Sequence, residues 1–358
     1  MKKILLTGGG TAGHVTPNIA LIPYLKDAGF EIEYMGSYNG IEKKLIEEQG
    51  IPYVGISSGK LRRYHDIKNL TDPARILKGL REAKKYMKLN RPDIVFSKGG
   101  FVSVPVIYAA ASYNIPVVIH ESDLTPGLAN KLSIPKATKI CYNFPETEQY
   151  LPAGKSVHTG LPVRRQLLDG DPHKGYAFCG YSEDKPLIMV IGGSLGAASV
   201  NEVVREALPE LLKKVYVAHI CGKGKMDPAF FNTPGYKQFE YVSDTLPDLF
   251  AAADVIVSRA GANVIYEIVA IKKPSILIPL GTDASRGDQI LNAKSFKRRG
   301  FAEVLFEDHL TKDALFNDIV EVAHNRQSYI DAMNAERTED SAKLVTDVIL
   351  EVLEETQK

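Results

Sequence analysis

KKILLTGGGTAGHV, residues 2–15, leads from an apolar run directly into a glycine loop. The glycines Gly8, Gly10 and Gly13 have the spacing G-x-G-x-x-G, and the run before them predicts a buried strand. A strand, a glycine turn and a helix in this order are typical of a dinucleotide-binding α/β domain. Many proteins contain this spacing, so it predicts a fold class and leaves the ligand open.

The same order of strand and helix repeats along the chain and restarts once. Apolar runs without polar alternation, such as DIVFS (93–97), predict parallel strands that helices cover on both faces. A second strand with its own glycine loop, PLIMVIGGSLGAAS (186–199), begins the second series. The Pro-, Gly- and charge-rich stretch 156–175 between the two series predicts a linker. We expect an α/β protein with two doubly wound parallel-sheet domains, 1–160 and 161–340, and a C-terminal helix, 341–358, that packs back on the first domain.

Composition narrows the class of protein. The chain has 358 residues, 44% of them hydrophobic, and a net charge of +1, so two cored domains are expected and nothing points to nucleic acid. Cys141, Cys179 and Cys221 lack C-x-x-C spacing, which favours buried thiols in a reducing compartment. The N-terminal apolar run is too short for a secretory signal, and no stretch approaches a membrane span. We therefore expect a cytoplasmic location.

Two common nucleotide sites fit these loops poorly. A P-loop is excluded because neither glycine loop is followed by Lys-Ser or Lys-Thr. An NAD-dependent dehydrogenase usually has an acidic residue at the end of its second strand, whereas this strand ends EYMGS (33–37), with Glu31 and Glu33 placed earlier. The dehydrogenase stays an alternative, as does a non-catalytic module that binds a UDP-sugar.

Six motifs in order are similar to those of the bacterial glycosyltransferase family 28 enzymes that transfer N-acetylglucosamine to a lipid-linked muramyl-pentapeptide. The motifs are GGGTAGHVTP, SKGGFVSVP, HESDLTPGLANK, GLPVR, GGSLGAASVN and SRAGANVIYEI with DQILNA. The resemblance covers essentially the whole chain. It implies a GT-B fold, in which two Rossmann-like domains face one another across a cleft. It also implies inverting transfer from UDP-N-acetylglucosamine to lipid I, giving lipid II for peptidoglycan, with no cofactor and no metal. A UDP-sugar 2-epimerase or another GT-B enzyme would share the fold.

The resemblance also assigns residues to the two substrates. The predicted catalytic residues are His14, an imidazole that titrates near neutral pH, and Glu121, as base or orienter. The acceptor diphosphate is expected at Gly9, Gly10 and Gly13. The predicted donor site consists of Thr11, Ala12, Gly13, Asp123, Arg164, Gly193, Ser194, Gly196, Val242, Ala262, Asn263, Val264, Glu267, Gln289 and Asn292.

Side-chain chemistry supports two of these positions, Glu267 and Arg164, and makes a third, Asp123, doubtful. Glu267 is expected about one and a half turns into a helix, where its carboxylate can accept from both ribose hydroxyls. Arg164 can compensate the charge of the leaving UDP. Asp123 stands where the family usually has asparagine, and a carboxylate cannot donate a hydrogen bond at neutral pH, which makes that donor contact uncertain. Asp169 and Asp171 have the D-x-D spacing of a metal motif, but they lie in the predicted linker, so no metal site is expected.

A basic amphipathic segment lies between residues 60 and 91, with eleven Lys or Arg and three Asp or Glu. Such a segment can lie on an anionic membrane surface, and a core-facing stripe with a solvated basic face is the plainer alternative. We expect peripheral binding to the cytoplasmic face of the membrane, with other cell-wall synthesis proteins as further partners. The residues predicted to contact the membrane are Arg75, Ile76, Leu77, Lys78, Leu80 and Arg81.

Overall fold

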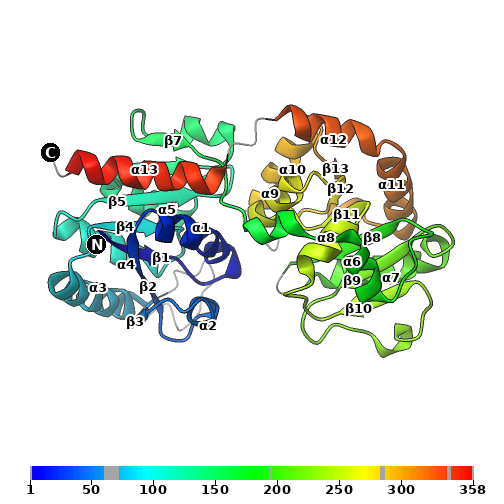
Figure 1. Cartoon of the computed structure of the whole chain (residues 1–358), viewed down its shortest axis with the longest axis horizontal. Helices are drawn as coiled ribbons and strands as arrows, with labels where there is room; N and C mark the ends of the chain where they lie inside the picture. Colours follow the sequence, from blue (N-terminus) through cyan, green and yellow to red (C-terminus); the bar gives the residue numbers. More distant parts are fainter. Residues whose placement is uncertain (1, 60–71, 194–195, 283–286, 337–339, 357–358) are drawn as a thin grey trace. The chain divides into compact units, whose positions relative to one another are not determined.

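The chain forms two compact units in a computed structural model that describes residues 2–59, 72–193, 196–282, 287–336 and 340–356 (Figure 1). The first unit is Met1–Val163 with Glu339–Lys358, and the second is Arg164–Thr338. The predicted donor residue Ser194 and the basic stretch 60–71 lie outside the described residues.

The first unit contains a parallel sheet of seven strands in the order β3-β2-β1-β4-β5-β6-β7. Its strands are β1 (Lys2–Thr7), β2 (Phe30–Ser37), β3 (Tyr53–Ile56), β4 (Ile94–Ser97), β5 (Val117–Glu121), β6 (Lys139–Tyr142) and β7 (Ser156–His158). Its helices are α1 (Thr16–Asp27), α2 (Ile41–Glu47), α3 (Asp72–Asn90), α4 (Ser103–Ser112), α5 (Leu128–Ser133) and α13 (Ser341–Thr356).

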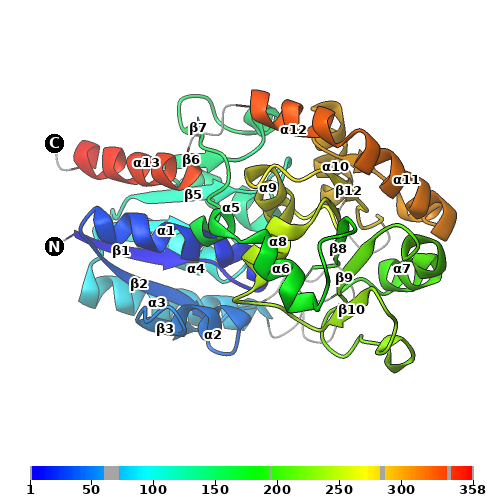
Figure 2. The same ribbon diagram turned by 45° about the vertical axis from the view of Figure 1, so that its right-hand side comes forward.

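Helices cover both faces of this sheet because the strands carry apolar side chains on both. On one face, Leu6 of β1 and Phe96 of β4 share a buried cluster with Leu21 of α1 and Val345 of α13. The opposite face packs on α3 and α4. Figure 2 shows α13 and α1 beside the same sheet, although α13 follows the second unit in sequence. The C-terminal helix therefore belongs to the first unit.

The second unit contains a parallel sheet of six strands in the order β10-β9-β8-β11-β12-β13. Its strands are β8 (Leu187–Ile191), β9 (Tyr216–Ile220), β10 (Tyr236–Phe239), β11 (Val255–Ser258), β12 (Ser275–Leu277) and β13 (Glu303–Val304). Its helices are α6 (Pro172–Cys179), α7 (Ala198–Leu211), α8 (Leu246–Ala252), α9 (Ala262–Ala270), α10 (Asp288–Arg298), α11 (Lys312–His324) and α12 (Arg326–Ala335). One face packs on α7 and α11.

The prediction of a linker over 156–175 was wrong at both ends. Residues Ser156–His158 form β7 and pair with β6, and α6 begins at Pro172. The error has a physical cause, since three residues are enough for an edge strand but too few for a periodic apolar signal.

Each sheet reverses its strand order once, and each glycine loop follows a strand at that reversal. In the first sheet the reversal lies between β1 and β4, and in the second between β8 and β11. Open parallel sheets bind ligands beyond the carboxyl ends of the strands at such a switch point. The topology therefore places one candidate site after β1 in the first unit and another after β8 in the second.

Candidate functional site

The first glycine loop is held by groups of its own unit. The carbonyl of Gly8 accepts from the Tyr34 hydroxyl at 2.8 Å, and the N–H of Gly9 donates to the carbonyl of Gly99 at 3.3 Å. The N–H of Gly10 donates to Oε2 of Glu42 at 3.3 Å. Both N–H groups have partners within the unit, so a diphosphate at Gly9 and Gly10 would have to replace these two contacts, and the assignment stays a prediction.

His14 ends a short 3₁₀ turn, Ala12–His14, immediately before α1. Its Nδ1 lies 3.0 Å from the carbonyl oxygen of Gly9 and 3.1 Å from Oγ1 of Thr11. Because a carbonyl oxygen can only accept, Nδ1 carries the proton, and in the neutral ring Nε2 then carries the lone pair. This is the tautomer that a base needs. The predicted donor residues Thr11, Ala12 and Gly13 adjoin His14 in the same partly exposed turn.

Glu121 is buried at the end of β5, and donors engage both of its oxygens. Oε1 accepts from the N–H of Asp123 at 3.0 Å, while Oε2 accepts from the N–H of Gly127 at 2.9 Å and from Nδ2 of Asn130 at 2.8 Å. Burial raises the pKa of Glu121, and the nearby Asp123 raises it further. The carboxylate is therefore placed to hold the turn that carries Asp123, and this geometry favours the orienter over the base.

Lys98, which the sequence analysis did not single out, is buried beside this turn. Its Nζ lies 2.9 Å from Nδ1 of His120 and also contacts the Ser122 hydroxyl. Burial lowers the pKa of Lys98 to about 8, against the opposing effect of Glu121 and Asp123. Lysine in SKGGF directly after a strand was the only signal in the sequence. The turn therefore combines two carboxylates with a buried cation.

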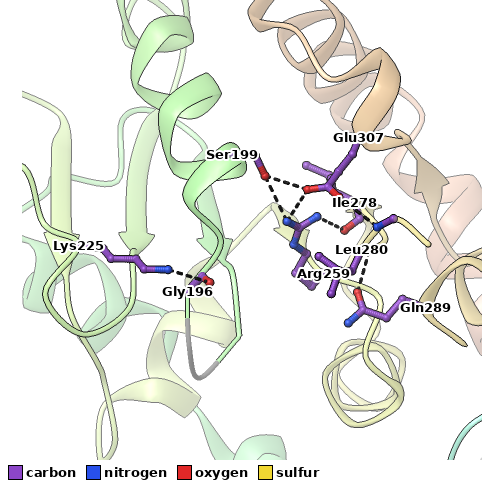
Figure 3. Close-up of polar contacts among 9 residues, drawn as sticks. Gly196, Ser199, Lys225, Arg259, Ile278, Leu280, Gln289 and Glu307 are labelled. Carbon is purple, nitrogen blue, oxygen red and sulfur yellow. Dashed lines mark hydrogen bonds and ion pairs between the residues drawn. The ribbon is translucent and has the colours of Figure 1, made fainter. Parts of the chain in front are cut away.

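In the second unit, the loop after β8 is shaped by glycine. Gly193 and Gly196 have φ angles of 85° and 67°, in the left-handed region that favours glycine. A Cβ at Gly196 would also lie 2.1 Å from the carbonyl oxygen of Cys221. Figure 3 shows the Lys225 ammonium reaching the carbonyl of Gly196, at 3.2 Å. A cation therefore lies next to the loop that is predicted to face the donor diphosphate.

The structure brings Arg164 and Glu267 together. The Nε and Nη2 atoms of Arg164 lie 3.3 and 3.1 Å from Oε1 of Glu267. Glu267 is 9% exposed, and burial raises its pKa although Arg164 opposes the shift. Glu267 lies in α9, which follows β11, as predicted. The sequence analysis assigned both residues to the donor site but did not pair them with one another.

Arg259 was missed in the sequence analysis. It follows β11 directly, and its guanidinium donates to the Ile278 carbonyl at 3.2 Å and to Oε1 of Glu307 at 2.6 Å (Figure 3). The Ser199 hydroxyl, from the start of α7, also donates to Oε1 of Glu307, at 2.8 Å. Burial alone would raise the pKa of Glu307, but these hydrogen bonds outweigh it and lower the pKa. The network joins α7 to the ends of β11 and β12.

Two predicted sugar contacts have internal partners. Asn292 is buried, and its Nδ2 donates to the carbonyl of Ala260 at 3.2 Å, so its side chain supports the turn before α9. Oε1 of Gln289 accepts from the N–H of Leu280 at 3.0 Å (Figure 3). Each side chain has a second polar group besides the one engaged here, so the predicted sugar contacts of Gln289 and Asn292 stay predictions.

The remaining predicted donor residues lie around α9 and after β10. Val242 is buried in the segment that follows β10. Ala262, Asn263 and Val264 form the first turn of α9, where backbone N–H groups at a helix start can face a ligand. The structure therefore gathers the predicted nucleotide contacts at the carboxyl end of the second sheet.

Comparison with known proteins decides the family. The model of the glycosyltransferase family 28 N-terminal domain matches residues 4–142, and that of the C-terminal domain matches residues 187–348. The chain belongs to glycosyltransferase family 28. A protein of Lachnospira eligens is 60% identical over 98% of this chain and 99% of its own length. Its name is UDP-N-acetylglucosamine--N-acetylmuramyl-(pentapeptide) pyrophosphoryl-undecaprenol N-acetylglucosamine transferase. A Clostridium botulinum protein of the same name is 53% identical over 98% of this chain and 99% of its own length.

Solved structures support the same fold. The crystal structure of Acinetobacter baumannii MurG has a TM-score of 0.76 and 27% identity, over 98% of this chain and all of that one. A structure from Listeria monocytogenes titled a putative UDP-N-acetylglucosamine 2-epimerase has a TM-score of 0.73 over 99% of this chain and 98% of that one. Its 13% identity shows a shared fold only. The prediction of two Rossmann-like parallel-sheet domains of the GT-B type is therefore confirmed, and the epimerase resemblance adds nothing to the choice of reaction.

Asp171 of the D-x-D motif has a structural role at the start of α6. The Asp171 side chain accepts from the N–H of His173 at 3.0 Å and caps α6, while its own N–H donates to Oδ1 of Asp248 at 2.8 Å. Among the described residues, no group of three or more His, Cys, Asp or Glu side chains is placed to hold a metal ion.

Helix α3 divides its apolar residues between the core and the surface. Ala83 and Met87 are buried against the first sheet, so part of the predicted stripe faces the core. Leu77 is 48% exposed, between exposed Arg75 and Lys78. Over the part of the chain that the structure describes, we find no helix with the length and hydropathy needed to cross a bilayer.

Proposed function

We propose that the chain transfers N-acetylglucosamine from UDP-N-acetylglucosamine to the muramyl sugar of undecaprenyl-diphospho-muramyl-pentapeptide. The observation that carries the proposal is the identity of 60% over 98% of the chain with a transferase of that name. The two glycine loops at the two switch points agree with it, because both substrates contain a diphosphate. The product would enter peptidoglycan synthesis.

In the proposed mechanism His14 is the general base. The muramyl hydroxyl oxygen attacks the anomeric carbon of the donor, the bond from that carbon to the UDP oxygen breaks with inversion, and Nε2 takes the hydroxyl proton. The hydrogen bond between Nδ1 and the Gly9 carbonyl supports this role, because it fixes the tautomer. Glu121 acts on the turn that carries Asp123, and the acceptor diphosphate is assigned to the first glycine loop.

The second unit is proposed to bind the donor. Gly193 and Gly196 allow the chain to approach the diphosphate closely, and the first turn of α9 adds backbone donors. Two hydrogen bonds from Arg164 engage Oε1 of Glu267, so the ribose hydroxyls are assigned to Oε2. In this arrangement the guanidinium lies next to the nucleotide and can compensate the charge of the leaving UDP.

The acceptor is proposed to reach the first unit from an anionic membrane. Exposed Arg75, Lys78 and Arg81 on α3 supply the charge, and exposed Leu77 supplies apolar contact. We propose that the chain works at the cytoplasmic face of the membrane, with other cell-wall synthesis proteins as partners.

Transfer itself tests the proposal. The purified chain is incubated with UDP-N-acetylglucosamine and a lipid I analogue with a short prenyl chain, and UDP release and the disaccharide product are measured together. We expect equal amounts of both, with and without excess chelator. UDP release without a disaccharide would indicate hydrolysis, and an epimeric UDP-sugar without UDP release would indicate epimerisation. Either result would overturn the assigned reaction.

A further inference from the structure

Glu42 is a fully buried carboxylate next to the first glycine loop. It is the second residue of α2, and its relative exposure is 0%. Oε1 accepts from the N–H of Ser37 at 3.0 Å and from the Ser37 hydroxyl at 2.5 Å, while Oε2 accepts from the N–H of Gly10 at 3.3 Å. Every one of these contacts is a donor to the carboxylate. The end of β2 and the glycine loop therefore meet on one side chain.

Three glycines leave the space that this side chain fills. A Cβ at Gly9 would lie 2.6 Å from Glu42, a Cβ at Gly36 would lie 2.8 Å from it, and a Cβ at Gly40 would lie 2.1 Å from it. These positions belong to the glycine loop, to β2 and to the residue before α2. Gly36 and Gly40 were not part of any site in the sequence analysis. The packing of Glu42 thus explains the glycines at positions 9 and 40, and Glu42 together with the Tyr53 hydroxyl explains the glycine at position 36.

The carboxylate acts on the segment that holds His14. Gly10, which donates to Glu42, directly follows Gly9, whose carbonyl accepts from Nδ1 of His14. In a dinucleotide-binding loop the second glycine lets the backbone approach a pyrophosphate, and here its N–H faces the carboxylate instead. In this loop a carboxylate that belongs to the protein therefore accepts from a backbone N–H that could otherwise face a phosphate.

We propose that Glu42 is a positioning residue for the transfer reaction. Its carboxylate fixes the Gly9–Gly10 backbone and thereby orients His14. The inference rests on the proposed role of His14 as general base. The inference also means that the Gly10 N–H donates to Glu42 and not to the acceptor diphosphate. Glu42 itself is fully buried, and its effect on the reaction passes through the loop.

The first test is Glu42→Gln, which keeps the shape and removes the charge. Its amide group would place N–H donors against the N–H of Gly10 or Ser37, so the loop loses an acceptor. We expect kcat to fall about 10- to 100-fold, because small misplacements of a reacting group cost that much, with donor KM within about twofold. Glu48→Gln is the matched control. Glu48 is an exposed glutamate at the end of the same helix, where its carboxylate pairs with Lys44. This control variant should leave kcat unchanged.

The decisive test is a double-mutant cycle with His14→Ala. If Glu42 acts through His14, Glu42→Gln should lower kcat no further in the His14→Ala background. Equal fold losses in both backgrounds, or an unchanged kcat in the single Glu42→Gln variant, would overturn the positioning role. A normal kcat in His14→Ala alone would instead refute the proposed base, so the two failures are distinguishable.

A milder variant keeps the inference testable if Glu42→Gln does not fold. Ser37→Ala removes only the hydroxyl donor to Oε1 and leaves the carboxylate in place. Far-UV circular dichroism and calorimetry with UDP report whether both units are folded. We expect a smaller fall in kcat, of about 3- to 10-fold, that again disappears in the His14→Ala background. A folded Ser37→Ala variant with normal kcat would count against the proposal.

Discussion

Replacing Arg164 by methionine should leave the Glu267 carboxylate buried in the second unit without its cationic partner. The guanidinium donates two bonds to Oε1, at 3.1 and 3.3 Å, and the Glu267 side chain is only 11% exposed. Breaking a buried ion pair by removing one partner costs about 3–5 kcal/mol, because the other charge stays buried without compensation. We expect Arg164→Met to lower the free energy of unfolding by about that amount at neutral pH.

The reverse change should cost less. In Glu267→Gln the amide oxygen still accepts from Arg164, whose side chain is 29% exposed and can reach water, so we expect a loss of about 1 kcal/mol. The double variant Arg164→Met with Glu267→Gln contains no buried charge at this position. It should therefore be more stable than Arg164→Met alone, which is a coupling that independent sites do not show.

The pH dependence gives a second measure. Burial raises the pKa of Glu267 above its usual 4.5 and Arg164 opposes the shift, so removing Arg164 should raise the pKa further. The native state then binds more protons than the unfolded state above pH 4.5, and stability falls as the pH rises through the native pKa. The deficit of Arg164→Met should thus be larger at pH 8 than at pH 5.

Urea unfolding followed by far-UV circular dichroism measures these values, since the chain has no tryptophan. Calorimetry with UDP adds the function: Glu267→Ala should weaken UDP binding about ten- to a few hundred-fold if two ribose hydroxyls donate to this carboxylate. Equal losses in the two single variants that simply add in the double variant would refute the buried pair. An unaltered UDP dissociation constant in folded Glu267→Ala would refute the ribose assignment.

Three further predictions concern other parts of the chain. His14→Ala should lower kcat by roughly 10²- to 10⁴-fold with little change in UDP affinity, and a loss below tenfold in steady-state kinetics would exclude a general base. Replacing Arg75, Lys78 and Arg81 by glutamate should release the chain from anionic vesicles in a flotation assay, because each basic residue contributes about 1 kcal/mol there. Unchanged flotation would assign these residues to ordinary surface. Burial lowers the pKa of His219 to about 3. Between pH 6.5 and 3 the unfolded state therefore binds more protons than the native state, and the free energy of unfolding should fall by up to about 1.4 kcal/mol per pH unit on acidification. Urea unfolding should show a flatter pH profile for His219→Gln, and identical profiles would contradict this prediction.

The sequence was sufficient for the architecture. Apolar runs between helical patterns predicted parallel strands, and the two glycine loops predicted two doubly wound domains, as the two parallel sheets confirm. The motifs predicted the family, which the two domain models confirm. These features succeed because strand, turn and helix preferences are local, and each is contained in a dozen or so neighbouring residues. The three-residue strand β7 was missed because it is shorter than any such pattern.

Only the tertiary structure decided which groups are left to bind a substrate. Glu42 meets Gly10 from 32 positions away, and Arg164 meets Glu267 from 103 positions away. Asn292 meets the Ala260 carbonyl from 32 positions away. Hydrogen-bond partners across such separations depend on strand order and helix packing, and a buried polar group takes whatever partner that packing supplies. A motif therefore identified which residues gather at the strand ends, while the fold determined which of them face one another.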